Sequence, residues 1–233
     1  MMIQTKATKD MWTNIYKALT ALNAENVEIR ASKDGWRVNQ TDPSRVGMVS
    51  IKIPDIAFAS YECTDCAIAI PMAALKSMLA VFDSEIETTV DEKGLLTMKA
   101  GNIRRTCRTV EVQDEPKIPG IQCTVSAQIN ATKLLKVMSI SDYTDYITVR
   151  SSDKGLQFET AGDTDSTEID YPMEGLETAQ AAYPLEYIRP IIASLPSDVM
   201  ISFANDYPCM IAVEEPFSIR FLLAPRIEDS AQE

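Results

Sequence analysis

The sequence predicts an α+β protein of two similar domains, each with helix, strands, helix and strands in that order, and with strands predominating. Three observations lead to this prediction. The two halves of the chain repeat the same patterns, stretches with a helical period alternate with stretches of period two, and a proline-rich segment separates the halves. A chain of 233 residues suits two domains of about 110 residues each.

The first repeated pattern is a strand, a polar turn and a second strand. It occurs at residues 27–36 and again at 147–156, each time with an Arg, two small residues, two charged residues and a Gly at the same spacing. This spacing suits a hairpin whose Gly takes a positive φ. A helix-period stretch precedes each hairpin, at residues 11–22 and, after a predicted N-cap at Asn130, at 134–138.

The second repeated pattern is a helix that begins with proline. It occurs at residues 71–82 and 184–195, and proline is common at the first helical position. Alternating strands follow at 86–98 and 199–213. Pro190, inside the later helix, is expected to kink or shorten it because proline removes a backbone hydrogen bond.

The segment at residues 113–122 is predicted to be an extended linker. It contains two prolines and a glycine, which exclude regular structure. The predicted boundaries are therefore 1–112 for the first domain, 113–122 for the linker and 123–233 for the second domain. Ile118 is apolar, which is unusual for a passive tether.

The composition disfavours enzymes. The chain has no His, which removes Ser-His and Cys-His nucleophile pairs and the commonest metal ligand. Of the five cysteines, Cys63 and Cys66 have the spacing of a zinc or redox pair, but a zinc site needs two more ligands. We expect two reduced structural cysteines, and no catalytic residue, cofactor or metal. A carboxylate-based hydrolase remains an unfavoured alternative.

No membrane partner is expected. The N-terminus lacks an apolar signal core, and the longest apolar run, at residues 66–75, is far shorter than the roughly 18 residues a membrane span needs. The expected location is the cytoplasm. The net charge of −12 argues by itself against nucleic acid, because phosphate contacts need Lys and Arg. Whether the chain binds nucleic acid therefore depends on where its basic residues lie.

Several motifs, in order along the chain, resemble the archaeal and eukaryotic PCNA-type DNA sliding clamps. They are Asp42-Pro43-Ser44-Arg45-Val46, the strand from Phe58 to Cys63, the duplicated halves with their linker, and the tail Leu222-Leu223-Ala224-Pro225-Arg226-Ile227-Glu228-Asp229. The resemblance covers essentially the whole chain. It implies the DNA clamp fold, with two helices packed on antiparallel sheets in each domain, and a ring of three subunits around duplex DNA.

In such clamps the helices line the hole, so their exposed faces should be basic. The helix-borne cations expected to face DNA are Lys9, Lys17, Lys76, Lys133, Lys136 and Arg189. Contacts of this kind go to phosphate and carry no sequence information, which suits a clamp that slides. An outer surface that holds most of the 34 acidic residues would keep the duplex in the hole. Ordinary solvated helix faces are the alternative.

The resemblance also places two oppositely charged strands at the edges that pair between subunits. The expected interface residues are Arg104, Arg105, Arg108 and Val110 on one strand, and Asp165, Glu168, Ile169 and Asp170 on the other. One basic and one acidic edge would pair head to tail and close a ring, here a homotrimer. Alternatively, both strands are merely edges protected by charge.

Family partners insert a short peptide with apolar and aromatic anchors beneath the linker. Carried over by position, the pocket comprises Thr41, Val46, Met48, Ile118, Pro119, Pro208, Leu222, Leu223, Ala224 and Pro225. Thr41 departs from the family, which often has a larger apolar residue there. The Leu-Ala-Pro end is expected to be exposed, and exposed apolar patches usually mark interfaces.

The predicted function is therefore a DNA sliding clamp, a processivity factor without catalytic chemistry. Its partners would be double-stranded DNA, DNA polymerase, a clamp loader, and ligase or flap nuclease. A separate loader would use ATP, since the chain has no Gly-x4-Gly-Lys-Ser/Thr loop. Alternatives are a subunit of a heterotrimeric clamp, a specialised viral or plasmid clamp, and a protein-binding scaffold. The protein would act in the cytoplasm at the nucleoid, or in the nucleus of a eukaryote.

Overall fold

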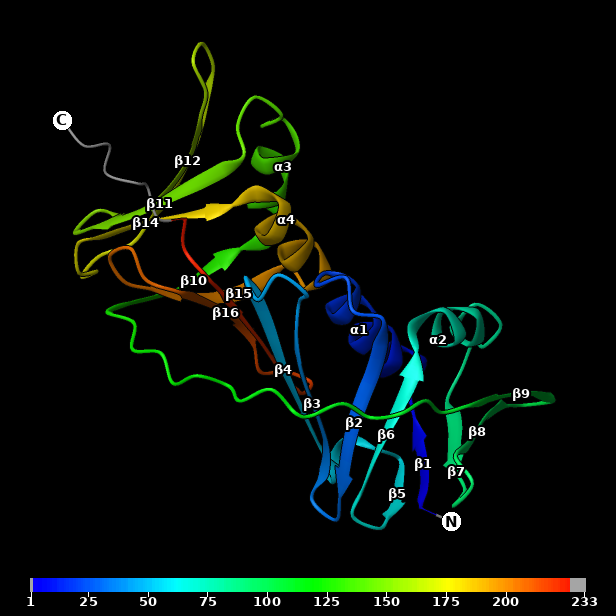
Figure 1. Cartoon of the computed structure of the whole chain (residues 1–233). Helices are drawn as coiled ribbons and strands as arrows, with labels where there is room; N and C mark the ends of the chain where they lie inside the picture. Colours follow the sequence, from blue (N-terminus) through cyan, green and yellow to red (C-terminus); the bar gives the residue numbers. More distant parts are fainter. Residues whose placement is uncertain (1, 227–233) are drawn as a thin grey trace. The chain divides into compact units, whose positions relative to one another are not determined.

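The computed structural model describes residues 2–226 of the chain (Figure 1). It confirms the α+β class, with helices packed against antiparallel sheets. The helices are α1 (Lys9–Thr20), α2 (Met72–Leu79), α3 (Ala131–Ser139) and α4 (Leu185–Ser194). Contacts divide the chain into two compact units, of which the first holds Met1–Ile118 and Glu214–Ile219 and the second holds the rest. Between residues 111 and 123 the chain forms no helix or strand.

The first unit contains two sets of antiparallel strands. One sheet has the order β5 (Ser60–Cys63), β1 (Ile3–Ala7), β7 (Ile86–Val90), β8 (Leu95–Ala100) and β9 (Ile103–Arg108). The other strands run in the order β6 (Cys66–Pro71), β2 (Asn26–Ser32), β3 (Gly35–Thr41) and β4 (Gly47–Pro54), and the 3-10 helix η1 (Asp55–Ala57) follows β4. Helices α1 and α2 pack against each other (Figure 1).

The second unit repeats this arrangement. One sheet has the order β13 (Ser166–Pro172), β12 (Gly155–Ala161), β11 (Tyr146–Ser152) and β14 (Ala179–Pro184). The other strands run in the order β10 (Val125–Asn130), β15 (Asp198–Phe203), β16 (Cys209–Val213) and β17 (Ser218–Leu223), and of β17 the second unit holds the part from Arg220 onward. Helix α3 packs against α4 (Figure 1). Each unit thus has two helices on antiparallel strands, as the sequence predicts.

Side-chain caps begin one helix in each unit. The Thr8 hydroxyl accepts a hydrogen bond from the Met11 amide (3.2 Å), and the Asn130 side chain accepts one from the Lys133 amide (3.1 Å), which confirms the predicted N-cap. Helices α2 and α4 start one residue later than predicted. Their prolines, Pro71 and Pro184, occupy the N-cap position and end the preceding strand.

Two glycines set the equivalent hairpins of the repeat. Gly35 joins β2 to β3 with φ of 125°, and Gly155 joins β11 to β12 with φ of 135°. A Cβ atom at Gly35 would lie 2.1 Å from the Ile53 carbonyl oxygen, and one at Gly155 would lie 2.2 Å from that of Tyr171. The predicted need for glycine is confirmed, because both the backbone angle and the neighbouring strand exclude a side chain.

Aromatic residues fill the core of the first unit. The Trp12 and Trp36 rings lie 5.2 Å apart, Trp36 lies 4.7 Å from Phe58, and all three residues are buried. The role of Phe58 corrects the prediction of a strand from Phe58 to Cys63. The 3-10 turn of η1 ends at Ala57 and delivers Phe58 to the core, so that β5 begins only at Ser60.

Helix α4 also differs from expectation, since it continues through Pro190 to Ser194 and is not shortened. Among the helices of residues 2–226, none has the length and apolarity needed to span a membrane.

Candidate nucleic-acid interface

In the first unit, two predicted DNA-facing lysines lie on open helical faces. Lys17 of α1 and Lys76 of α2 are exposed, on helices whose other faces are buried. Lys9 is only half-exposed, and its ammonium group lies 3.7 Å from the Asp83 carboxylate. An exposed lysine on a folded helix offers a mobile point charge suited to phosphate without base recognition.

The second unit presents an equivalent basic face on α3. Lys133 and Lys136 are exposed, whereas Leu134 and Met138 of the same helix are buried. The helical period therefore separates the cations from the core, as the sequence predicts.

Arg189 of α4 has a different environment from the lysines. It is half-buried and donates a hydrogen bond from Nη2 to the Met138 carbonyl oxygen, in the last turn of α3, while its Nε is buried with no partner among the described residues. A cation at a helix C-terminus stabilises the free carbonyl groups there. Arg189 thus ties α4 to α3, so that its guanidinium is partly withdrawn from solvent.

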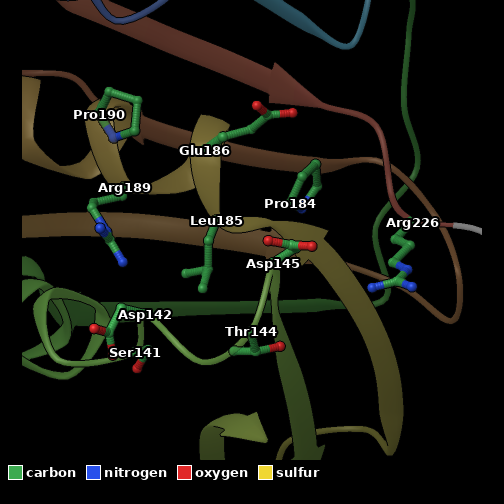
Figure 2. Close-up of a pocket in the computed structure, with 10 residues that line it drawn as sticks. All are labelled: Ser141, Asp142, Thr144, Asp145, Pro184, Leu185, Glu186, Arg189, Pro190 and Arg226. Atoms are coloured by element: carbon green, nitrogen blue, oxygen red, sulfur yellow. The ribbon is translucent and has the colours of Figure 1, made fainter. Parts of the chain in front are cut away.

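A hollow of about 780 Å³ lies beside Arg189 in the second unit, and Figure 2 shows the residues that line it. The loop before β11 and the start of α4 line it, and Arg226 lies at its edge. The Arg226 guanidinium lies 4.3 Å from the centre of the Tyr146 ring, and its amide donates to the Ala182 carbonyl oxygen (2.7 Å). Because the lining mixes these arginines with Asp142, Asp145 and Glu186, it favours no ligand of a single charge.

The two strands of opposite charge lie at the ends of their sheets. Strand β9 is an edge strand of the five-stranded sheet and carries Arg104, Arg105 and Arg108, all exposed. Strand β13 ends the four-stranded sheet, with exposed Glu168 and Asp170. An open edge leaves unpaired backbone groups available for another strand.

The faces of these edge strands are also distinct. Arg105 donates to the Ser77 hydroxyl of α2 (3.2 Å), so Arg104 and Arg108 point to the opposite face of β9. On β13, Glu168 and Asp170 each accept a hydrogen bond from Gln157 (3.2 Å) and share one face. Ile169 is half-buried, on the other face.

Two interface residues predicted to lie on these strands, Val110 and Asp165, lie just outside them, whereas Tyr171 of β13 was not among the predicted residues. Tyr171 donates its hydroxyl to the Asn130 carbonyl oxygen (2.8 Å), which links β13 to the start of α3. Burial raises the pKa of Tyr171 to about 12, so this hydroxyl remains a neutral donor at pH 7. Asp165 precedes β13 in a turn, where its carbonyl accepts the Gly162 amide (2.8 Å). Val110 lies beyond β9, bridged to Ala69, and is 42% exposed.

In the first unit, the predicted pocket residues surround a fixed turn. Thr41 pairs with Met48 across β3 and β4, and Val46 lies in the turn between them. The buried Asp42 carboxylate accepts the amides of Ser44 (2.8 Å) and Gly47 (2.6 Å). The Asp-x-Ser-x-Val motif is thus a carboxylate-closed turn that holds Val46 half-exposed.

The remaining pocket residues divide into exposed and buried ones. Ile118 is 39% exposed and Pro119 is exposed, while Pro208, Ala224 and Pro225 are half-buried. The expectation of an exposed Leu-Ala-Pro end is wrong for Leu223, which is 1% exposed, and Leu222 before it is 9% exposed. Successive strand residues point to opposite faces, so both faces are covered at the end of β17. The tail from Ile227 to Asp229 lies outside the described residues.

Cys63 and Cys66 are free thiols. The Cys63 thiol donates to the Ser32 carbonyl oxygen (3.0 Å), and burial together with the neighbouring Cys63 and Asp65 raises the pKa of Cys66. A raised thiol pKa disfavours the reactive thiolate. Within residues 2–226, no group of three His, Cys, Asp or Glu side chains could hold a metal ion.

One cluster was missed from the sequence. The Glu115 carboxylate, in the predicted linker, accepts hydrogen bonds from Arg37 of β3 (2.7 and 3.1 Å) and Asn39 (2.6 Å), and lies 3.1 Å from Nε of Arg30 on β2. The hydrogen bond from Arg37 is the main cause of the lowered pKa of Glu115. The available signal was Arg30 itself, which occupies the same repeat position as Arg150.

Comparisons with known proteins agree with this architecture. No family model matches the chain. A protein of Methanocella arvoryzae named DNA polymerase sliding clamp is 25% identical over 249 aligned residues, covering 97% of this chain and 99% of the relative. A structure of the C-terminal region of FEN-1 bound to A. fulgidus PCNA has a TM-score of 0.90 at 22% identity, covering 98% of this chain and 100% of that one.

PCNA from Thermococcus kodakaraensis has a TM-score of 0.88 at 20% identity, covering 97% of this chain and 100% of that one. These likenesses confirm the predicted DNA clamp fold along the whole chain.

Proposed function

The chain resembles the PCNA-type DNA sliding clamps along its whole length, and we propose that it acts as one. In this role it would form a ring around duplex DNA and tether DNA polymerase and other replication and repair enzymes. The observation that carries the proposal is the near full-length match to a protein named DNA polymerase sliding clamp. The clamp fold and the basic helical faces of both units support it.

The DNA-facing surface in this proposal centres on Lys17, Lys76, Lys133 and Lys136. All four are exposed and lie on helices. Lys9 and Arg189 belong to the proposed surface too, but each already has a partner in its own unit. Contacts from lysine to phosphate are independent of the DNA sequence, as sliding requires. They also weaken as the salt concentration rises.

Pairing of β9 of one subunit with β13 of the next would close the ring. The outward face of β9 offers Arg104 and Arg108, and that of β13 offers Glu168 and Asp170. Val110, Asp165 and Ile169 flank the contact. Such complementary charges favour head-to-tail association. We propose the homotrimer as the assembly.

Partners would bind as short peptides with apolar and aromatic anchors. One solved relative, A. fulgidus PCNA, holds the C-terminal region of the flap nuclease FEN-1. For this chain we propose equivalent peptides of polymerase, ligase, flap nuclease and clamp loader. Ile118 and Pro119 are the exposed members of the predicted pocket, with Val46 half-exposed. The chain itself would perform no catalysis, and ATP use would belong to the loader. It would act in the cytoplasm at the nucleoid.

Two measurements test the proposal. Light scattering should give about 77 kDa, three times the chain mass of 25.8 kDa. A mass of one chain would contradict the homotrimer and direct attention to a heterotrimer with sister subunits.

Polymerase processivity tests the DNA surface. Replacing Lys17, Lys76, Lys133 and Lys136 by Ala should abolish most of the stimulation, with the trimer mass unchanged. The matched control replaces four exposed lysines outside the helices, namely Lys33, Lys52, Lys93 and Lys154. Because it removes the same charge, equal loss in both variants would refute a specific role for the helical faces.

A further inference from the structure

A side chain of the predicted linker at residues 113–122, here called the connecting segment, is held by three polar groups of the first unit. Glu115 is three-quarters buried, and its carboxylate meets the guanidinium groups of Arg30 and Arg37 and the amide of Asn39, at 2.6–3.1 Å. Arg37 reaches both carboxylate oxygens. Bidentate, charge-assisted hydrogen bonds of this kind are the strongest and most directional that side chains make.

The backbone of the same segment is held nearby. Arg30 donates from Nη2 to the carbonyl oxygen of Gln113 (2.9 Å). Asp114, between these two contacts, is exposed, and so is Lys117. Segment 113–117 belongs to no helix or strand, so the contacts at Gln113 and Glu115 replace the ladder that would otherwise order its backbone.

The repeat explains why the hairpin β2–β3 can bind a carboxylate from outside itself, that of Glu115. In the second unit, Arg150 stands where Arg30 stands in the first, and it is held by Glu159 and Gln180 of the adjoining strands. The corresponding positions in the first unit are Asn39 and Ala67, which carry no charge. Gln157 is likewise replaced by a second arginine, Arg37.

We propose that Arg30, Arg37 and Asn39 form a carboxylate-binding site that anchors the connecting segment through Glu115. We further propose that this anchor positions Ile118, three residues onward, to receive partner peptides. The second statement rests on the proposed function, whereas the first does not. Glu115 is thus a positioning residue, which itself need not touch the partner.

The energetic argument concerns chain entropy. Each ordered backbone residue loses about 1–2 kcal/mol of conformational entropy. A segment that is ordered before the partner arrives avoids this loss at binding. Without the anchor, Ile118 would sample many positions, and the peptide would have to order the segment itself.

The anchor can be tested on the isolated protein by limited trypsin digestion. Lys117 is exposed and followed by Ile118, so trypsin can cut between them once the segment opens. Glu115→Ala should accelerate this cut by about five-fold, as expected for loss of a part-exposed charged hydrogen-bond group. The matched control is Asp114→Ala, which removes the same charge from the adjacent residue and should leave the rate unchanged. Mass spectrometry identifies the cut and separates it from cuts elsewhere.

A double-mutant cycle assigns the effect to the arginine site. If Glu115 acts through Arg37, the Arg37→Ala/Glu115→Ala double variant should be cut no faster than Glu115→Ala alone. The control pair, Arg37→Ala with Asp114→Ala, should show independent effects. Equal cutting rates for the wild type and Glu115→Ala, or independent effects in the first cycle, would overturn the anchor.

Peptide affinity then tests the positioning role. The probe is a labelled peptide of the FEN-1 C-terminal region, titrated against the wild type, Glu115→Ala and Asp114→Ala. We expect affinity to fall at least three-fold in Glu115→Ala only. Faster digestion with unchanged affinity would overturn the positioning role. A wild type that binds no peptide while Glu115→Ala is still digested faster would contradict the proposed partner site, and with it the positioning role, but would leave the anchor standing.

Discussion

The hairpins β2–β3 and β11–β12 are the same structure used in two ways. Each residue of the second lies 120 positions after its counterpart, so that Gly155 follows Gly35 and Arg150 follows Arg30. The glycines have nearly the same φ and meet the same kind of backbone obstacle. The arginines differ in their partners, because one is satisfied by adjoining strands and the other by the connecting segment.

This difference separates what the backbone demands from what a site demands. A glycine with positive φ beside another strand has no substitute, so both copies retain it. The carboxylate that neutralises the arginine can come from any nearby segment. In the second unit it is built into β12, which makes that surface complete in itself. In the first unit the surface is complete only when Glu115 is in place.

The largest effect is expected at the shared glycines. Gly35→Ala and Gly155→Ala should each lower the free energy of unfolding by about 2–3 kcal/mol, from the unfavourable φ and the blocked Cβ position. Urea denaturation of each variant measures this. The control is Gly101→Ala, where φ is 55° but nothing lies within 4 Å of the added carbon, so the cost should be smaller. A large loss of unfolding free energy in only one of the two variants would show that the two hairpins are not equivalent.

A smaller effect should distinguish the arginines. Arg150→Ala leaves the largely buried Glu159 carboxylate without its ion-pair partner, and should cost about 1 kcal/mol of unfolding free energy. Arg30→Ala should cost less, because Arg37 continues to hold Glu115. Urea midpoints of the two variants provide the comparison. A greater loss for Arg30→Ala would mean that the connecting segment contributes more to global stability than the built-in pair.

The smallest effect is a pH dependence that arises from Glu115. The hydrogen bond from Arg37, helped by Asn39 and the charge of Arg30, holds the pKa of Glu115 below its ordinary value of 4.5. A lowered carboxyl pKa adds stability that is fully present above the ordinary value and is lost as the pH falls through the folded-state value. The difference in Tm between the wild type and Glu115→Ala should therefore be constant above about pH 5.5 and shrink below pH 4.5.

The comparison with Glu115→Ala is needed because another carboxyl group nearby titrates in the opposite sense. Burial raises the pKa of Glu28, so its ionisation removes stability as the pH rises. Subtracting the two melting curves removes this contribution to first order. A Tm difference that grew toward low pH would contradict the assignment to Glu115.

The sequence predicted local features of the fold well. The helices, the cap at Asn130 and the glycine hairpins follow from spacings of a few residues, and the structure confirms them. It failed where the answer depends on distant neighbours. Leu223 was expected to be exposed, but the covering of both strand faces is a tertiary property. Glu115 was overlooked because its partner Arg37 lies 78 residues away.

The predicted site has the same limits. Helical spacing was enough to place Lys17, Lys76, Lys133 and Lys136 on exposed faces. It could not reveal that Arg189 turns back to a carbonyl of α3, since a guanidinium on a helical face and one folded against a neighbour have the same sequence.

If β9 of one subunit pairs with β13 of the next, as we propose, their unequal charge gives each subunit a direction. Two β9 edges brought together would place guanidinium groups against one another, and two β13 edges would place carboxylates against one another. Repulsion between like charges therefore disfavours two-fold symmetric pairs. Only unlike edges attract. A pair of subunits joined in this way still has one basic and one acidic edge free at its ends. Subunits would then add head to tail, and each open assembly would keep one free basic edge and one free acidic edge until these two edges pair and close the ring.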